Sequence, residues 1–436
     1  MTILVIKDSV LTKVDTKLAN CFVSTFQMFT IFKTVTMKHH FFKTLFWSVC
    51  AFTQISCSFP SNNKESDSDI GFGNYKSVTF KIDPEITDSP LETNQYIVDS
   101  IRTLESPNGL SSFDEEKFFV NNERIYIMDS DVEKSILVFD LSGNYLYKLG
   151  ERGRAKNEYL YGPTDFFVAM DGEVHVFDMD GRRILRFNNC GEFIERKETP
   201  IMNSFGLTSN NKYLYCLDNM NMPDEEPDPS LLIYDFKSES KKTLIPSKRF
   251  TYHYHPRYRT FFYNDARLYH IPILSDSILV FKDDIIESVV RFDFACGFLS
   301  MEKPECVRDN PDGSRPNVSR RGYKGVEAIY EYQESESYIY MRYIYKEYLK
   351  RWFYNKRTKQ IIHGNKLFAG LSVFNDYFLK GNQIIAYVGK ENVEMLKEYC
   401  ESEEFDKEEY KKTPSFVKAF QSGKLSAPAL VYITIK

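Results

Sequence analysis

The densest group of side chains suited to binding lies in the segment GERGRAKNEYLYGPTDFFV, residues 150–168. Five of its side chains carry charged or polar groups that can contact a ligand: Arg152, Arg154, Lys156, Glu158 and Tyr159. Cationic groups bind carboxylates through charge-assisted hydrogen bonds, so the segment predicts a loop that holds an anionic sugar or a peptide terminus beside Asp165. The alternative is a solvated connection in which Gly150 and Gly153 permit the turn.

Histidines form a second candidate site. His253 and His255 alternate along a predicted strand and therefore share one face, and His270 follows on the next strand. Three imidazoles could hold a metal such as zinc. The surroundings are aromatic and the sequence places no carboxylate nearby, so ordinary packed or surface histidines are the favoured interpretation.

Tyrosines crowd the same segment: Tyr252, Tyr254, Tyr258 and Tyr263. Exposed aromatic faces bind sugar rings, whereas aromatic stripes in β-proteins more often fill the core. From this segment we include Tyr254 and His255 among the predicted ligand-binding residues.

Acidic residues recur at one position of successive repeats: Asp129, Asp178 and Asp218. Carboxylates at equivalent positions could ring a channel and bind a cation such as calcium. Aspartates also bond turn backbone, which is the favoured interpretation. We therefore predict no cofactor, with calcium as the alternative, and assign no metal ligands.

Composition limits the functional class. The chain has 436 residues, a net charge of −5 and a sequence pI near 5.9, and a protein of this charge is not expected to bind nucleic acid. It holds 29 Tyr and 36 Phe against 2 Trp, which favours strands. The fingerprints of a nucleophile elbow, a zinc protease, a P-loop and a dinucleotide fold are absent.

The N-terminal part is typical of an export signal. Residues 37–57, MKHHFFKTLFWSVCAFTQISC, combine a basic start with a short apolar stretch and end at Cys57. This layout predicts a lipoprotein-type signal peptide in which Cys57 is lipidated. Gln54 departs from the usual leucine, so cleavage without lipidation is the alternative. Residues 1–36 are interpreted as a mis-annotated extension, and residues 58–74 as a flexible tether.

Internal repeats dominate residues 75–436. Phe118 and Phe166 open two similar units, and Phe139 and Phe187 recur at the same offset of 48. Each unit predicts four short strands, which is one propeller blade. Four weaker units follow, near residues 212–236, 252–294, 337–354 and 371–388. The sequence thus predicts an all-β, six-bladed propeller.

Two segments interrupt the repeats. Residues 297–325 are polar and contain three prolines, so we expect a long loop. Residues 391–422 have apolar positions at near-helical spacing and predict a small insertion of one or two helices near the C-terminus. The final strand, in SAPALVYITIK, is expected to pair with the early strand YKSVTFKI and so complete one blade from both chain ends.

Five cysteines lie within the repeats: Cys190, Cys216, Cys296, Cys306 and Cys400. None has CxxC spacing, which disfavours zinc and thioredoxin-type sites. Free thiols are favoured, with a disulfide between Cys296 and Cys306 as the alternative.

The leader ending at Cys57, residues 150–168, the strand–Asp–strand–Gly units and the terminal PALVYITIK together resemble the six-bladed, TolB-like propeller lipoproteins of Bacteroidetes. Members usually carry a Gly-Pro-Gly-Glu-Tyr run after the first blade. Here Glu158 and Tyr159 are kept and the glycines and proline are replaced. The resemblance implies an exported domain that binds glycans or peptides, and the altered loop leaves a shared ligand open.

We therefore expect a monomeric binding or interaction module, held at the outer membrane or cell surface by a lipid anchor. Its partner would be a glycan, a peptide or another envelope protein. A secreted or periplasmic protein is the alternative location. The alternative activity is that of a metal-dependent propeller hydrolase or lyase.

Overall fold

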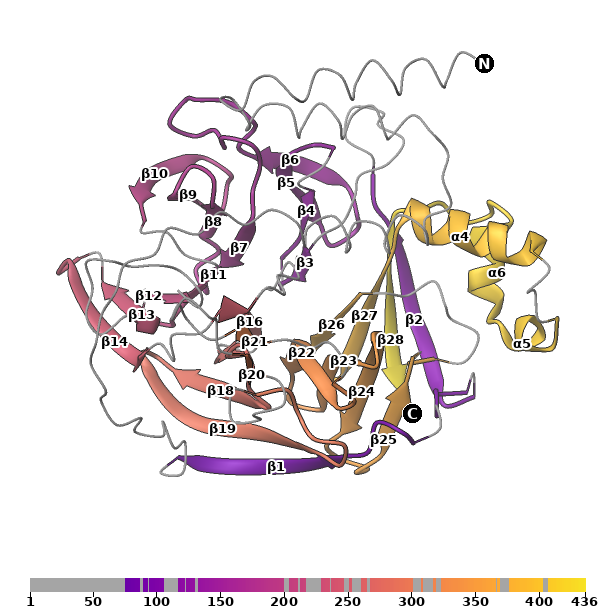
Figure 1. Cartoon of the computed structure of the whole chain (residues 1–436). Coiled ribbons are helices and arrows are strands. Elements are labelled where there is room, and N and C mark those ends of the chain that lie inside the picture. The colour runs from indigo at the N-terminus through magenta and orange to yellow at the C-terminus, as the bar shows by residue number, and fades with distance from the viewer. Residues whose placement is uncertain are drawn as a thin grey trace, which may run out of the picture. The chain divides into compact units, whose positions relative to one another are not determined.

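Strands make up nearly all of the regular structure (Figure 1). The computed structural model describes residues 75–436 with the exception of residues 87–88, 93, 106–116, 122, 130–131, 200–203, 211, 217–228, 236, 247–250, 253–259, 265–266, 301–306, 309–316, 319–322, 366, 369–375 and 403–406. The predicted signal peptide with Cys57, the tether and residues 1–36 lie outside the described residues.

Six sheets, each built on four antiparallel strands, form the blades. From the inner strand outward, blade one consists of β3 (Lys117–Val120), β4 (Arg124–Asp129), β5 (Ser135–Asp140) and β6 (Tyr145–Leu149). Blade two consists of β7 (Asp165–Val168), β8 (Val174–Asp178), β9 (Arg183–Phe187) and β10 (Phe193–Glu198). Blade three consists of β11 (Ser204–Leu207), β12 (Tyr213–Cys216), β13 (Pro229–Asp235) and β14 (Ser240–Pro246).

Blades four to six follow the same order. Blade four consists of β16 (Phe261–Asn264), β17 (Arg267–His270), β18 (Ser277–Lys282) and β19 (Ile285–Phe294). Blade five consists of β22 (Val326–Glu334), β23 (Tyr338–Tyr345), β24 (Tyr348–Asn355) and β25 (Ile361–Gly364). Blade six consists of β26 (Tyr377–Lys380), β27 (Gln383–Val388), β28 (Ala429–Ile435) and β2 (Tyr96–Thr103).

The inner strands close the ring. Contacts join β7 to β11, β11 to β16, β16 to β22, β22 to β26 and β26 to β3, and an ion pair between Lys117 and Asp165 joins β3 to β7. The predicted six-bladed β-propeller is therefore confirmed, and the two units with the 48-residue offset are blades one and two.

The core lies between neighbouring blades, which accounts for the aromatic composition. Phe177 of blade two packs against Phe205 of blade three with ring centroids 5.5 Å apart. Phe292 of blade four meets Trp352 of blade five at 5.7 Å. Edge-to-face pairs of this kind stabilise beyond the area that they bury. Outer strands such as β10 alternate between half-buried and exposed residues, as expected for a sheet edge.

The ring closes with a different N-terminal strand from the one predicted. β28 pairs with β2, and Tyr96 lies opposite Ile435 in the register. The predicted partner YKSVTFKI forms β1 (Lys76–Ile82), which instead adds in parallel to the outer edge of β19 in blade four. Figure 1 shows β1 running along β19, and β2 beside β28. Closure from both chain ends is therefore correct, but the assignment of YKSVTFKI to that blade is wrong.

In the described part of the segment between β27 and β28 there are three helices: α4 (Lys390–Glu401), α5 (Lys407–Lys412) and α6 (Ser415–Gln421). Val393 and Leu396 of α4, with Val417 and Phe420 of α6, are buried in the same cluster as blade six. The predicted helical insertion is confirmed, with three helices where one or two were expected. No described helix is long and apolar enough to span a membrane.

The predicted loop 297–325 contains two short strands, β20 (Val307–Arg308) and β21 (Asn317–Val318). They form a small separate sheet with β15 (Thr251–Tyr252). Cys296, just before them, is a free cysteine, as are Cys190 and Cys400. Cys306, the alternative disulfide partner, lies outside the described residues.

Strand register defines two faces of the ring. In blade two, Asp165 at the start of the inner strand pairs with Phe177, and Val168 at its end pairs with Val174. We call the end at which inner strands begin the loop face, because the connections between blades lie there. The opposite end, where each inner strand turns into the second strand, is the turn face.

Candidate ligand site on the loop face

Residues 150–164 connect β6 of blade one to β7 of blade two on the loop face. The backbone folds back on itself, because the Gly153 amide donates to the Tyr159 carbonyl and the Tyr159 amide donates to the Glu151 carbonyl, each at 2.8 Å. This predicted binding loop therefore has a defined conformation over its central residues.

Tyr159 holds the loop from inside. Its side chain is fully buried and its hydroxyl donates to the Leu149 carbonyl. Burial, with a smaller contribution from the Asp178 charge, raises the pKa of Tyr159 well above its usual range. The ring lies so close to Gly150 that a Cβ there would come within 2.7 Å of it. Tyr159 thus stabilises the loop, and its burial does not fit the ligand contact predicted from the sequence.

Glu158 also acts within the loop. Its carboxylate accepts a hydrogen bond from the Ala155 amide at 2.7 Å, and its carbonyl accepts one from Arg183 of β9 at 2.9 Å. Of the five residues predicted in this segment, Glu158 and Tyr159 therefore position the loop.

Asp178 at the end of β8 docks the loop onto blade two. It is fully buried, and its carboxylate accepts hydrogen bonds from the Leu160 amide at 2.9 Å, the Gly181 amide at 3.0 Å and Arg183 Nε at 2.8 Å. A buried carboxylate with three donors is fully engaged. Asp178 therefore bonds turn backbone, as the structural interpretation of the repeated aspartates predicts for this position.

Arg152, Arg154 and Lys156 are exposed on the loop. The Arg152 guanidinium lies 5.7 Å from the centre of the Tyr161 ring, which is itself exposed. The loop therefore presents three cations from a backbone that is fixed by buried contacts. Such a surface attracts carboxylates and other anionic groups.

An ion pair that the sequence reasoning missed lies at the inner edge of the loop face. Lys117 Nζ is 2.7 Å from Asp165 Oδ1 and donates to the Phe166 carbonyl at 2.6 Å. It also lies 4.4 Å from the centre of the Phe167 ring. In the described part of the chain, Asp165 Oδ2 is buried without a hydrogen-bond partner. Lys117 and Asp165 occupy equivalent positions of blades one and two, 48 residues apart. Their opposite charges at equivalent positions are the feature of the sequence from which this ion pair could have been predicted.

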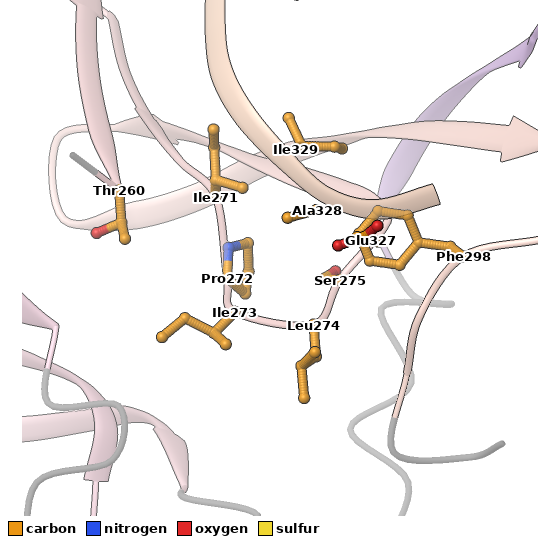
Figure 2. A pocket seen from close by; sticks show the side chains of 10 residues that line it. All are labelled: Thr260, Ile271, Pro272, Ile273, Leu274, Ser275, Phe298, Glu327, Ala328 and Ile329. Carbon is orange, nitrogen blue, oxygen red and sulfur yellow. The ribbon is translucent and has the colours of Figure 1, made fainter. Parts of the chain in front are cut away.

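A small pocket opens on the same face between blades four and five. Figure 2 shows Ile271–Ser275 on one side, with Glu327, Ala328 and Ile329 of β22 opposite and Phe298 beside them. Its cavity volume of about 20 Å³ is enough for one water molecule. Leu274 has φ of 57°, which is unusual for a residue other than glycine and stores strain in this loop. The pocket as formed here is too small for a sugar ring.

Some of the predicted histidine and aspartate site residues are buried in the protein, and the others lie outside the described residues. His270 is buried and stacks on Phe261 at 4.5 Å, and burial lowers its pKa to about 3. Asp129 is buried and accepts a hydrogen bond from the Val132 amide. Within the described residues, no group of three or more His, Cys, Asp or Glu is placed to hold a metal ion. His253, Tyr254, His255, Tyr258 and Asp218 lie outside the described residues.

Comparison with known proteins identifies a family and a fold. The profile of a family described as "Domain of unknown function (DUF4934)" matches residues 51–431. No curated protein matches the sequence. A solved Bacteroides fragilis protein described as exported is 15% identical, with a TM-score of 0.63, and the alignment covers 83% of this chain and 100% of that one.

Two further solved structures align less well. A member of the DUF4221 family from Bacteroides vulgatus is 12% identical with a TM-score of 0.39, covering 79% of this chain and 99% of that one. A virginiamycin B lyase from Staphylococcus aureus is 9% identical with a TM-score of 0.40, covering 78% and 100%. At these identities the likeness to the Bacteroides fragilis protein concerns the fold alone.

Proposed function

The chain belongs to the DUF4934 family, a domain of unknown function, and from its own geometry we propose that it is an exported binding module of the cell envelope. Its loop face holds the ligand, an anionic glycan, a peptide or an acidic segment of another envelope protein. The cations Arg152, Arg154 and Lys156 make the principal contacts.

One observation carries this proposal: the three cations are exposed on a loop whose backbone is held by buried groups. Tyr159, Asp178 and Arg183 fix the loop without using the exposed side chains. A surface that is ordered before binding loses less conformational entropy when the ligand arrives.

Export and anchoring rest on separate support. The Bacteroides fragilis protein that shares the fold is described as exported, and residues 37–57 have the layout of a lipoprotein signal. We propose that Cys57 carries the lipid and that the propeller is held at the outer membrane or cell surface. Release without a lipid, giving a secreted or periplasmic protein, is the competing outcome.

Removing the loop cations tests the binding proposal. The triple variant Arg152→Gln, Arg154→Gln, Lys156→Gln should lose at least tenfold affinity for an anionic glycan or peptide, because three charge-assisted contacts are lost. An array of sulfated, uronic-acid and neutral glycans together with acidic peptides identifies the probe, and calorimetry then gives Kd. Binding of the unaltered protein should also weaken as salt rises from 50 to about 300 mM, since the cations are exposed.

The matched control removes equal charge elsewhere. Lys237, Lys242 and Lys282 are exposed away from this loop, and replacing all three by Gln should leave Kd within about twofold. Equal losses in both triple variants would indicate a non-specific charge effect. No binding to any anionic probe by the unaltered protein would refute the proposal.

Lipidation is tested in the native host. Cys57→Ala should abolish incorporation of an alkyne-labelled fatty acid and move the protein from the membrane fraction to the soluble fraction. Cys50→Ala, in the same leader, should leave both properties unchanged. Unaltered protein that takes up no label would contradict the anchor and favour the secreted or periplasmic alternative.

A further inference from the structure

A second pocket lies on the turn face, where the inner strands of three consecutive blades end. Its lining comes from the ends of β7, β11 and β16 and from the turns that follow β7 and β11: Phe167, Val168, Ala169, Met170, Asp171, Leu207, Thr208, Ser209 and Tyr263. We call it the turn-face pocket. Because inner strands begin on the loop face and end here, it is separated from the cationic loop by the length of a strand.

Its size suits a single ring. The cavity volume is about 130 Å³, against about 20 Å³ for the pocket beside Ile271. Apolar cavities of about 150 Å³ in other proteins accept a six-membered carbon ring such as benzene. The turn-face pocket is slightly smaller, so it can take at most one six-membered ring, and the substituents of that ring must project from it.

The lining combines buried apolar side chains with hydroxyl and carboxylate groups. Phe167, Val168 and Leu207 are almost completely buried, with exposed fractions of 4%, 6% and 4%. Thr208, Ser209 and Asp171 add hydroxyl and carboxylate groups, and the half-buried Tyr263 adds an aromatic ring. The described lining residues include a carboxylate and no cation, which disfavours an anionic ligand.

The polar groups are held in place by neighbouring turns. The Thr208 hydroxyl donates to Asn210 and also accepts a hydrogen bond from the Lys212 amide at 3.0 Å. Ser209 Oγ donates to Asp283 of blade four at 2.5 Å. Asp171 Oδ1 accepts a hydrogen bond from the Glu173 amide at 3.0 Å. These bonds fix the orientation of the three polar side chains, and the second oxygen of Asp171 can accept a hydrogen bond from a ligand.

We infer that the turn-face pocket binds one neutral sugar residue in its pyranose form. The C–H face of such a ring matches the apolar lining and the aromatic ring of Tyr263. Its hydroxyl groups can donate hydrogen bonds, which matches the Asp171 carboxylate and the Ser209 hydroxyl oxygen as acceptors. This site is independent of the anion site on the loop face, and either can be present without the other.

Saturation-transfer NMR tests the inference with defined probes. Glucose, galactose, mannose and N-acetylglucosamine are each mixed with the purified protein, with glucuronate as the anionic comparison. At least one neutral sugar should receive saturation at its ring protons, and glucuronate should receive less. Tyr263→Ala removes the aromatic ring and Asp171→Asn removes the carboxylate charge while keeping the turn acceptor, and each should reduce the transfer at least fivefold.

Controls separate this site from the loop-face site and from misfolding. The triple cation variant on the loop should keep the full transfer, and thermal unfolding should show that the pocket variants remain folded. Asp171 is exposed, so Asp171→Asn provides a folded test even where Tyr263→Ala is unstable. Transfer from no neutral sugar, or transfer that persists in Asp171→Asn and Tyr263→Ala, would overturn the inference.

Discussion

Deleting residues 429–436 is expected to abolish cooperative unfolding of the propeller. These residues contain β28, which lies between β27 and β2 in blade six and so joins β2 to the rest of that blade. Leu430, Val431 and Ile433 are fully buried, and burial of each such side chain contributes about 1.5–3 kcal/mol. Their sum is comparable to the 5–15 kcal/mol that typically stabilises a whole domain. Circular dichroism during heating measures the effect.

Single substitutions in β28 measure smaller parts of the same contribution to stability. Ile433→Ala should cost about 2–5 kcal/mol of the free energy of unfolding because it leaves a cavity. Thr434→Ala removes an exposed hydroxyl that donates to Asp99, and should change stability by less than about 0.5 kcal/mol. A truncated protein that still unfolds cooperatively at a similar temperature would contradict the role of β28 in ring closure.

Replacing Asp178 by Ala is expected to destabilise blade two and release the cationic loop. The change leaves the buried Arg183 without its carboxylate and the Leu160 amide without its acceptor. Breaking a buried charge pair on one side costs about 3–5 kcal/mol. Urea unfolding should record that loss, and hydrogen exchange should be faster at the amides of residues 150–164. Affinity for the anionic probe should fall as the loop loses its fixed conformation.

Two substitutions provide the comparison. Asp178→Asn keeps a side-chain acceptor and loses the charge, so an intermediate loss is expected. Asp180→Ala removes a surface carboxyl whose pKa is raised by partial desolvation and by the neighbouring Asp178 charge, so its loss should be neutral or slightly stabilising. If Asp178→Ala matched Asp180→Ala, the loop would not depend on this carboxylate.

The blades could be predicted because each is a local pattern. Four short strands, their turns and the recurring phenylalanines all lie within about 48 residues, so repetition in the sequence marks them directly. The helical insertion was equally local. The pairing of the chain ends was not, because β1 and β2 both have strand-forming sequences. Which of them meets β28 depends on packing between residues more than 300 positions apart.

Only some features of the candidate site could be predicted from the sequence, for a similar reason. The sequence shows which side chains carry charge, and Arg152, Arg154 and Lys156 are exposed as a binding loop requires. It does not show which polar groups turn inward, and Tyr159 was assigned to the ligand although it anchors the loop. The turn-face pocket combines residues of three blades, and only Tyr263 among them stood out in the sequence.

The direction of β1 has a mechanical consequence. β1 begins at Lys76 on the turn face and runs parallel to β19 toward the loop face, with Ile82 opposite Phe294. A force that draws the chain from its N-terminal side, along the axis of β1, loads all the backbone bonds of this ladder at once, as in shear. Peeling would break them one at a time. Pulling on the N-terminal end of β1 is therefore expected to meet more resistance than peeling β1 away from β19.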